Sequence, residues 1–528
     1  MVKTVDFAHI PEYAKIPHIA LMPLLLYNVR IGSYLTESLQ VLSNKGAVHR
    51  MIATSVSFQT RDAALQKLYD TACEQCLGNL TLFGNDQVLV EGGGYEKIWL
   101  ETQPMGGEMY AKRNMTAALN NHLLFMKTQR GDGRLAGSIQ CMPDGTIEPQ
   151  FNKFQGFCFP WSAFNMYYLM GRDRAYLDRL ADCLTRFDGY LWAVRDSDGD
   201  GCLESWCLYD TGEDNALRYG NAPVYCSEDV PPKGCDVVPI GSMDFMSYSY
   251  ACRDTLAAIS RIRGDGEEAL WRDGARDVAA RMKALLWDES RGACFDRDKH
   301  GRRMPTLVHN NLRCMYWGSF SRQMADRFVR EHLINPAEFW TPFPLPSVAA
   351  NDPLFRDAPE NNWSGQCEGL TYQRAILALE RYGWEGLVTA LGKKLLHAVI
   401  RGGYLFTQQF SPFTGEPSKV GKYSHAVLPD GASEPVQDAY GPTLLSVLEY
   451  IAHIWGVHMQ MGQVWFSLGR ADAPYTYEQT WGDHTYIIRS DGCHARIQAD
   501  GKDLGCFACD QRIIIDENRR TLAVRPIA

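Results

Sequence analysis

The chain has 528 residues, 45% of them hydrophobic and 22% charged, which is typical of a globular protein with several cores or one large closed core. Its 53 basic and 62 acidic residues give a net charge of -9, and the absence of a basic run argues against nucleic acid and anionic membranes as partners. The first residues lack the layout of a signal peptide, and the apolar run at residues 19–27 is too short to span a bilayer, so we expect a cytoplasmic protein.

Most of the chain shows the spacing of amphipathic helices. Leu65, Leu68, Tyr69, Ala72 and Cys76 follow the i, i+3, i+4 pattern and predict a first helix after residue 62. Similar patterns predict further helices near residues 115–128, 161–170, 174–193, 243–263, 267–287, 319–333, 365–382, 386–400 and 440–456. The long loops between them are rich in aromatic residues, Gly and Pro, and loops of such length commonly carry function.

This alternation of helix and rich loop predicts a mainly α protein with an (α/α)6 toroid, in which paired helices form two concentric rings. After about residue 456 the pattern changes to short alternating runs separated by Asp-Gly and Glu-Asn turns, which predicts a small β unit. We therefore expect three parts: an extended or β segment at 1–58, the helical barrel at 59–457, and a C-terminal β domain at 458–528.

The cysteines and one acidic turn carry side chains that can ligate metals. Sixteen cysteines in a chain without a leader predict reduced thiols, and the pairs Cys73/Cys76 and Cys506/Cys509 have no His beside them to favour zinc. Asp196, Asp198 and Asp200 occupy the first positions of a calcium loop, but Cys207 stands where the bidentate Glu should be. We expect a self-hydrogen-bonded turn with calcium as the alternative, and no other cofactor or metal.

The segment from Arg195 to Tyr219 combines seven carboxylates with Trp206 and two tyrosines. Aromatic faces pack on sugar rings, and a carboxyl group kept protonated among them can give its proton to a glycosidic oxygen. The crowded polar sequence Thr211-Gly-Glu-Asp-Asn-Ala-Leu-Arg218 makes Asp214 the candidate acid, whereas a solvated acidic loop is the alternative interpretation.

Four segments of residues 60–456 together resemble inverting glycosidases of glycoside hydrolase family 63 and the mannosylglycerate and glucosylglycerate hydrolases, to which trehalases are related. The first is Gly-x-Asp-Asn-x-x-Arg at residues 212–218. The others are the proline-rich loop at 334–354, Asn362-Trp-Ser-Gly365 at the start of a helix, and Ser411-Pro-Phe-Thr-Gly-Glu416. The resemblance implies an (α/α)6 barrel and inverting hydrolysis, with Asp214 as general acid.

The position that the resemblance implies for the general base holds Gln408, and a neutral amide cannot take a proton from water at pH 7. Glu434 is the favoured replacement because its segment also carries Gln437, Asp438 and Tyr440 just before a helix. The other candidates are Glu416, Glu368 and Glu101.

The substrate-binding predictions combine aromatic platforms with hydroxyl-binding groups. Trp99 is expected to stack on a sugar, although a core Trp is an equal alternative, and Trp363 opens a polar segment in which Ser364 replaces the family's Arg. The other predicted substrate-binding residues are Glu101, Asn215, Arg218, Glu368, Gln408 and Tyr440.

The expected function is that of an inverting, exo-acting glycoside hydrolase on a small glycoside or oligosaccharide. Three alternatives stay open: a toroid-fold polysaccharide lyase using Tyr209, Arg218 and His425, a retaining glycosidase, and a carbohydrate-binding protein that has lost its base at Gln408. The sequence does not indicate the sugar, the anomeric configuration or the oligomeric state.

Overall fold

The computed structural model describes residues 41–42, 48–49, 52–358, 363–418 and 437–528. The chain forms two units, at 1–50 and 51–528. In the first, β1 (Val41–Leu42) pairs antiparallel with β2 (Val48–His49). The predicted base Glu434 and His425 lie outside the described residues.

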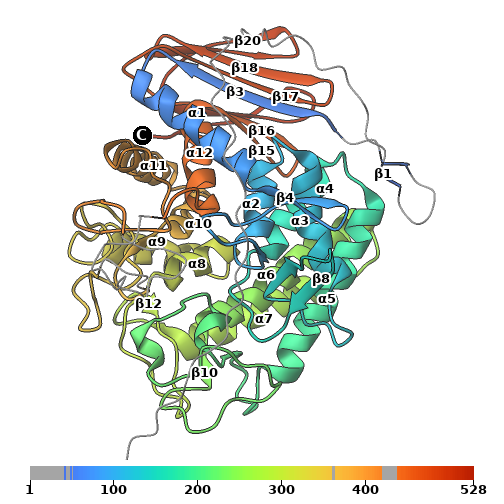
Figure 1. Cartoon of the computed structure of the whole chain (residues 1–528), viewed down its shortest axis with the longest axis vertical. Coiled ribbons are helices and arrows are strands. Elements are labelled where there is room, and N and C mark those ends of the chain that lie inside the picture. The colour runs from blue at the N-terminus through green and yellow to red at the C-terminus, as the bar shows by residue number, and fades with distance from the viewer. Residues whose placement is uncertain (1–40, 43–47, 50–51, 359–362, 419–436) are drawn as a thin grey trace, which may run out of the picture. The chain divides into compact units, whose positions relative to one another are not determined.

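The described part of the second unit contains twelve α-helices (Figure 1), more residues than its strands hold, which agrees with the prediction of a mainly α protein. The helices are α1 (Ala63–Gly78), α2 (Gln103–Tyr110), α3 (Met115–Lys127), α4 (Phe159–Leu169), α5 (Arg174–Val194), α6 (Met243–Arg263), α7 (Glu268–Leu286), α8 (Asn310–Trp317), α9 (Arg322–Phe328), α10 (Gly369–Glu380), α11 (Glu385–Arg401) and α12 (Gly441–Trp455). A π-helical turn, Val329–Leu333, extends α9, and the 3-10 turns Leu208–Asp210 and Leu217–Tyr219 lie between α5 and α6.

The even-numbered helices contact one another in a closed succession. Helix α2 packs on α4, α4 on α6, α6 on α8, α8 on α10, α10 on α12, and α12 again on α2. Helices α3, α5, α7 and α11 each pack against an even-numbered helix next to them in sequence, and α1 packs against α12. Because one odd-numbered helix returns the chain between successive even-numbered helices, the even-numbered helices run in one direction. Their N-terminal ends therefore lie together.

Local sequence explains where many helices begin. The side chains of Asp62, Asn114, Asp173, Ser242 and Ser321 each accept a backbone N–H at the start of a helix, which satisfies donors that have no partner within the helix.

Helices α2 and α8 were not predicted from the sequence. Their sequences, QPMGGEMY and NNLRCMYW, contain helix-weakening Gly and Asn and lack a polar face, because both helices are buried almost throughout. Packing against their neighbours stabilises them where intrinsic propensity does not.

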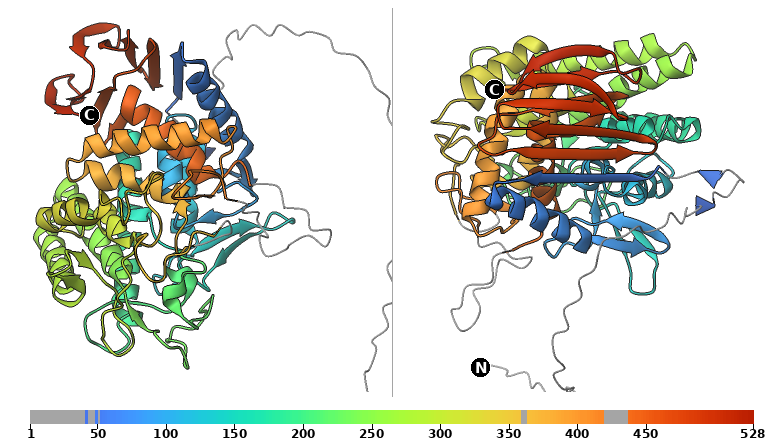
Figure 2. Two further views of the ribbon diagram at one scale, coloured as in Figure 1. Left: turned by 90° about the vertical axis from the view of Figure 1, so that its left-hand side faces the viewer. Right: turned by 90° about the horizontal axis from the view of Figure 1, so that it is seen from above.

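The C-terminal residues form two antiparallel sheets, which confirms the β-rich character expected there. One has the order β15-β16-β21-β22 and the other the order β20-β19-β18-β17-β3. The strands are β3 (Thr54–Thr60), β15 (Val457–Gln460), β16 (Gln463–Leu468), β17 (Tyr475–Trp481), β18 (His484–Ser490), β19 (His494–Ala499), β20 (Lys502–Ala508), β21 (Gln511–Ile515) and β22 (Thr521–Pro526). Strand β3 comes from the start of the unit, yet it pairs along its whole length with β17, from Thr54↔Trp481 to Thr60↔Tyr475. Figure 2 shows it beside the C-terminal strands. The expected boundaries at 58 and 457 stay predictions, and β3 crosses the first of them.

Short strands stiffen the loops between the helices. These are β4 (Leu80–Phe83), β5 (Asp86–Leu89), β6 (Ile98–Trp99), β7 (Ser138–Cys141), β8 (Ile147–Gln150), β9 (Glu204–Ser205), β10 (Ile240–Gly241), β11 (Trp287–Asp288), β12 (Ala293–Cys294), β13 (Cys367–Glu368) and β14 (Gln409–Phe410).

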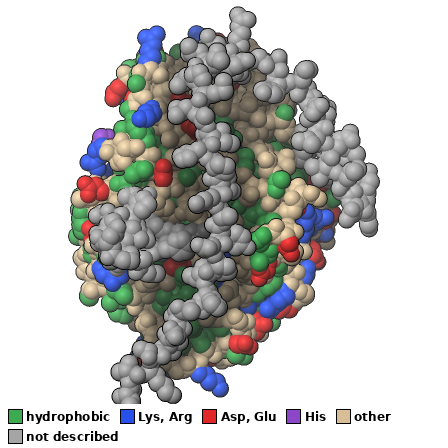
Figure 3. Space-filling model, in the orientation of Figure 1, with side chains coloured by type: hydrophobic (Ala, Val, Ile, Leu, Met, Phe, Trp, Pro, Cys, Tyr) green, Lys and Arg blue, Asp and Glu red, His purple; other side chains and the backbone are tan. Residues whose placement is uncertain are grey.

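The distribution of surface charge and the state of the cysteines agree with what the amino-acid composition predicts. Acidic and basic side chains are interspersed over the described part of the face shown in Figure 3. All sixteen cysteines are free thiols, and most of them are buried. Among the described helices, none has the length and apolar character needed to cross a membrane.

Candidate active site

The candidate site lies at the N-terminal ends of the even-numbered helices, where the preceding loops deliver polar side chains. Glu101 stands just before α2, Gln155 before α4, Glu368 immediately before α10 and Tyr440 immediately before α12. Unpaired backbone N–H groups and the helix dipole make such ends favourable for negative charge. The fold thus gathers carboxyl groups from distant parts of the sequence at one end of the helices.

Asp214 lies half-buried in the loop between the two 3-10 turns that follow α5. Its carboxylate accepts a hydrogen bond of 3.0 Å from the side-chain amide of Gln155. Gln155 has a positive φ of 57°, which is uncommon for a residue other than glycine and is characteristic of side chains that the surrounding structure holds in place. The predicted acid is therefore oriented by a residue that no sequence motif indicated.

Glu213, the neighbour of Asp214, is fully engaged in an ion pair. Arg218 binds both of its carboxylate oxygens, at 2.6 and 3.1 Å, and also contacts Asp296 at 2.5 Å. Burial alone would raise the pKa of Glu213, but the charge and hydrogen bonds of Arg218 lower it well below its usual range. Glu213 is thus a permanent anion, and Arg218 is held by acidic side chains of the protein.

The loop that carries Asp214 is fixed at several points by side chains far away in sequence. Asn215 accepts a hydrogen bond of 2.9 Å from the backbone N–H of Trp363, and Ser364 accepts one of 2.9 Å from the N–H of Leu217. Arg313 donates to the carbonyl oxygen of Thr211 at 2.6 Å. Ser364 therefore supports the loop.

Glu101 lies directly against this loop at a glycine. Its carboxylate accepts a hydrogen bond of 2.8 Å from Arg374. A Cβ atom on Gly212, whose φ is +72°, would lie 2.3 Å from Oε2 of Glu101. Gly212 is required here both by the backbone conformation and by the close approach of this carboxylate.

Glu368 faces the strand that follows the predicted base position. Strands β13 and β14 pair so that Glu368 lies opposite Gln409, whose side-chain amide donates to Oε1 of Glu368. The other carboxylate oxygen, Oε2, is buried and has no hydrogen-bond partner among the residues that the structure describes. Gln408, beside Gln409, accepts a hydrogen bond of 3.1 Å from the hydroxyl of Tyr95.

Glu91 and Tyr440 complete this group of side chains. The hydroxyl of Tyr440 donates to Glu91 at 3.0 Å, and the ring of Tyr440 meets that of Tyr95 edge-on at 6.2 Å. Tyr440 was predicted as a substrate-binding residue, whereas Glu91 and Tyr95 were seen only as part of a glycine-rich loop.

Burial shifts the pKa of three carboxyl groups of this site upward. Burial raises the pKa of Glu368 well above its ordinary value, and the neighbouring charge of Asp214 raises it further. Burial likewise raises the pKa of Glu91, with Glu101 and Asp214 adding to the effect. Burial raises the pKa of Glu101 as well, although Arg374 opposes the increase. Carboxyl groups whose pKa is shifted by burial and by neighbouring charges are common at catalytic sites.

Comparison with known proteins identifies the family to which a chain with this site belongs. Residues 107–426 match the family model described as the mannosylglycerate hydrolase MGH1-like glycoside hydrolase domain. The chain belongs to this glycoside hydrolase family. It is a glycosidase and its substrate is a carbohydrate, as the resemblance of the four sequence segments implied.

Solved structures show the same fold at low sequence identity. The GH63 mannosylglycerate hydrolase from Thermus thermophilus in complex with glucose is 16% identical, with a TM-score of 0.56 over 72% of this chain and 99% of that chain. A protein described as a sialidase is 13% identical, with a TM-score of 0.62 over 88% of this chain and 41% of the other. An α-L-rhamnosidase from Dictyoglumus thermophilum is 10% identical, with a TM-score of 0.51 over 86% and 45%.

The predicted aromatic platforms of the glycosidase differ in their surroundings. Trp99 is half-buried, and the ammonium groups of Lys97 and Lys153 lie 5.5 and 5.2 Å from its ring centroid. Burial and the like charge of Lys97 lower the pKa of Lys153 to about 8, although Asp214 opposes the shift. Trp363 is 2% exposed and packs edge-on against His309, so it contacts the loop and the interior.

Two groups of side chains outside this site could offer metal ligands. Asp196, Asp198 and Asp200 bring carboxylate oxygens within 4.8 Å of one another. They also accept backbone N–H groups of their own turn, and Asp200 binds Arg297 at 3.0 Å, as expected for a self-hydrogen-bonded turn. Calcium at this turn stays a prediction.

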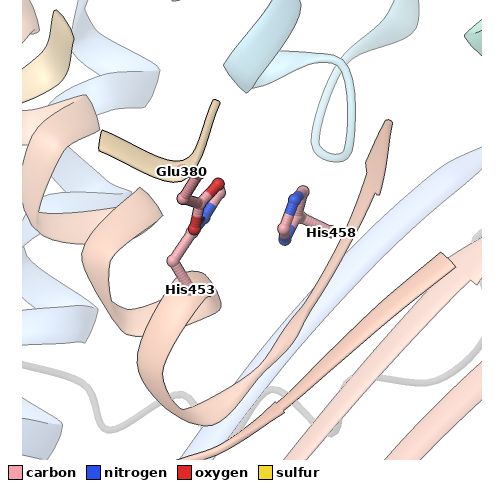
Figure 4. A group of neighbouring side chains, drawn as sticks. All are labelled: Glu380, His453 and His458. Carbon is pink, nitrogen blue, oxygen red and sulfur yellow. Dashed lines mark hydrogen bonds and ion pairs between the residues drawn. The ribbon is translucent and has the colours of Figure 1, made fainter. Parts of the chain in front are cut away.

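The second group lies at the opposite ends of the helices and consists of Glu380, His453 and His458 (Figure 4). The two imidazole rings are stacked, with centroids 3.8 Å apart and planes inclined by 18°, so their lone pairs do not converge on one point. Arg512 binds Glu380 at 2.5 Å and Lys112 binds Glu449 at 2.8 Å. These side chains already balance the negative charge that a bound cation would balance. This group therefore suits a structural role better than a cation site.

Some residues of the active site were predicted and others were not. Five residues predicted for one site do gather at one end of the helices, although their roles stay predictions: Asp214, Glu101, Glu368, Gln408 and Tyr440. Glu416 is exposed in the turn after β14. The residues missed from the sequence are Glu91, Tyr95, Lys97, Lys153, Gln155 and Gln409. Tyr95 and Glu91 stand in the glycine-rich loop before Trp99, and a search of that loop for acidic and aromatic side chains could have found them.

Proposed function

We propose that this glycosidase hydrolyses the glycosidic bond of a small glycoside with inversion, releasing a terminal sugar, and that Asp214 is its general acid. The observation that carries the proposal is the placement of Asp214. The Asp214 carboxylate is oriented by Gln155 and lies close enough to Glu91 and Glu368 to raise the pKa of both. Inverting glycosidases require such a pair of carboxyl groups, about 6.5 to 9.5 Å apart, with a water molecule between them and the sugar.

We assign the closed succession of even-numbered helices to the inner ring of an (α/α)6 toroid. The contacts of α12 with α2 support ring closure, and the antiparallel odd-numbered helices support the outer ring. Loops at one end of such a ring enclose a site from all sides, which favours removal of a terminal sugar over cleavage within a long chain.

In this proposal Asp214 gives its proton to the glycosidic oxygen as the bond to the anomeric carbon breaks. The acid must be protonated before the reaction, and its surroundings of buried carboxyl groups favour retention of a proton within the cluster. Glu213 cannot take this role because Arg218 holds it as an anion.

The second part of the substrate is proposed to carry a carboxylate. Lys97 and Lys153 flank Trp99 beside Asp214, and two ammonium groups next to an aromatic face suit an acidic group joined to a sugar. This agrees with the name of the matching family, and with one related structure described as a complex with Tris and D-glycerate. A glycosylglycerate is thus the substrate to try first.

One observation favours a second candidate function. Gln408 occupies the position implied for the base, so a carbohydrate-binding protein without catalysis is the competing proposal. Incubation of the pure protein with mannosylglycerate, glucosylglycerate and a panel of aryl glycosides separates the two, because binding without release of sugar supports only the second.

The test of the acid is the variant Asp214→Asn. We expect the rate constant kcat for an unactivated glycoside to fall by about 100- to 10,000-fold, the usual contribution of a positioned acid. The loss should be much smaller for a dinitrophenyl glycoside, whose leaving group needs no proton. Asp182→Asn, on the exposed face of α5, is the control and should keep full activity. Equal losses on both substrates would show that Asp214 is not the acid.

A further inference from the structure

A glycosidase that acts by inversion needs a base, and Gln408 cannot serve as one. Its amide group is neutral at any pH at which the protein is folded, and it accepts a hydrogen bond from Tyr95. The base must therefore be a carboxylate that lies elsewhere but still faces Asp214. Four buried glutamates lie in this part of the described structure: Glu91, Glu101, Glu213 and Glu368.

Three of these four carboxylates are already committed to other groups. Glu213 forms a two-point ion pair with Arg218, and Glu101 forms an ion pair with Arg374 at 2.8 Å. Glu91 accepts a hydrogen bond from the hydroxyl of Tyr440. An ion pair stabilises the charged carboxylate and thereby weakens it as a base, because the proton it would accept must replace a cation.

Glu368 has no cationic partner among the described residues, unlike Glu213 and Glu101, and unlike Glu91 it has a buried oxygen without a donor. The neutral amide of Gln409 binds its Oε1, while its Oε2 is buried and without a partner among the described residues. Asp214 is the charged group with the largest effect on it. A buried carboxylate oxygen without a donor is costly, and a water molecule or a substrate hydroxyl would satisfy it.

The β13–β14 pairing places the carboxylate of Glu368 beside Gln409, the residue that follows the predicted base position at Gln408. Glu368 and Gln409 are cross-strand partners, and such partners have Cβ atoms about 4.5 to 5.5 Å apart on the same side of the ladder. The carboxylate of Glu368 thus lies next to Gln409, one residue along the chain from the predicted base position.

We propose that Glu368 is the general base of this glycosidase. The assignment rests on the proposed hydrolysis. One water molecule forms a bond to the anomeric carbon while Glu368 takes one of its protons. The bond from that carbon to the glycosidic oxygen breaks, and Asp214 gives its proton to the leaving oxygen. Sugar, leaving alcohol and one consumed water balance, and the two carboxyl groups exchange protons with solvent before the next cycle.

Gln409 is a positioning residue in this assignment. By donating to Oε1 of Glu368 it fixes the carboxylate plane and leaves Oε2 for water. Its hydrogen bond also lowers the pKa of Glu368 against the opposing effects of burial and Asp214, so it favours the basic form.

Glycosyl fluorides test the assignment, because fluoride leaves with little help from an acid but still requires an activated water molecule. The probe is a panel of glucosyl and mannosyl fluorides of both anomeric configurations. We expect Asp214→Asn to keep most of its fluoride hydrolysis and Glu368→Ala to lose at least about 100-fold. Sodium azide should restore turnover of Glu368→Ala by forming a glycosyl azide of inverted configuration, since the small residue leaves room for an anion that needs no base.

Controls separate the possible failures of this experiment. Glu74→Ala removes an exposed carboxylate of α1 and should behave as the wild type. Glu368→Gln preserves shape and is used with circular dichroism in case Glu368→Ala does not fold. Folded Glu368 variants that hydrolyse fluorides at the wild-type rate would overturn the base assignment but leave the glycosidase intact. The same conclusion would follow if azide restored turnover of Glu434→Ala and not of Glu368→Ala. A wild type that hydrolyses no member of the panel and no glycosylglycerate overturns the proposed hydrolysis and the base together.

Discussion

At the scale of single residues, the site depends on which partner each carboxylate has. Glu213 and Asp214 are adjacent in sequence, yet Arg218 holds one as an anion while Gln155 gives the other a hydrogen bond from a neutral amide. The same contrast separates Glu101, which is paired with Arg374, from Glu368, which accepts from the amide of Gln409. A cationic partner stabilises the charged form of a carboxyl group more than a neutral donor does, so the ion-paired carboxylates suit support of the loops.

Gly212 gives a test of this close packing. In Gly212→Ala the new Cβ would overlap Oε2 of Glu101 at 2.3 Å, so we expect Asp214 to shift and the rate constant kcat to fall by about 100-fold or more, as displacements near 1 Å can cause. Gly199→Ala is a matched control, because Gly199 also has a φ of +72° but no atom within 4 Å of its Cβ position. An equal loss of activity in the two variants would mean that backbone strain, and not contact with Glu101, matters at residue 212.

At the scale of elements, the two ends of the even-numbered helices have different tasks. Their N-terminal ends carry the carboxyl groups of the site. Their C-terminal ends carry the group of Glu380, His453 and His458, which joins α10 and α12 to β15 and, through Arg512, to β21. This second group borders a cavity of about 60 Å³ and stabilises the contact between helices and sheet.

The histidines of this group predict how stability depends on pH. Burial, together with Arg512 and Lys112, lowers the pKa of His453 well below its ordinary value, and burial with the neighbouring His453 does the same for His458. Below about pH 6.5 the unfolded chain binds protons that the folded chain does not, so stability falls as the pH falls, by up to about 1.4 kcal/mol per pH unit for each histidine.

The variant His458→Phe should make the free energy of unfolding less dependent on pH between 6.5 and 5, as measured by urea denaturation. His397→Phe, on the exposed face of α11, is the control and should leave the slope unchanged. If the slope of His458→Phe equals that of the wild type, His458 binds protons equally in the folded and unfolded chains and the account of this group is wrong.

The sequence predicted the helices with their own amphipathic pattern, and α6 was placed at its observed residues. It could not predict α2 and α8, because these eight-residue helices are buried almost throughout, contain helix-weakening residues and depend on neighbours for stability. Asp214 was predictable because its motif is local. The pairing of Glu368 with Gln409 was not, since it joins strands 41 residues apart and follows only from their register.

At the scale of the whole molecule, β3 connects the start of the second unit to its end. Phe58 of β3 packs against Tyr69 of α1, Trp455 of α12, and Tyr475 and Tyr477 of β17, with ring centroids 5.5 to 6.4 Å apart. One side chain therefore contacts both the helices and the sheet. This explains why residues 51–528 form a single unit by their contacts.

The variant Phe58→Ala should lower the free energy of unfolding by about 3 to 5 kcal/mol, the usual cost of removing a buried Phe. Because helices and sheet share this contact, far-ultraviolet circular dichroism and tryptophan fluorescence should report one coincident transition at a lower denaturant concentration. Ser57→Ala, on the exposed side of the same strand, should have little effect. Two separate transitions, with only the strand signal lost early, would show that sheet and helices fold independently.

The configuration of the first sugar released tests the central claim most directly. Proton NMR, recorded within seconds to minutes of adding enzyme to a glycosylglycerate or an accepted aryl glycoside, distinguishes the newly formed anomer before mutarotation mixes the two. An acid at Asp214 and a base at Glu368, acting through one water molecule, predict that the anomer opposite to that of the substrate appears first. First appearance of the same anomer, or of an unsaturated product, would contradict this account.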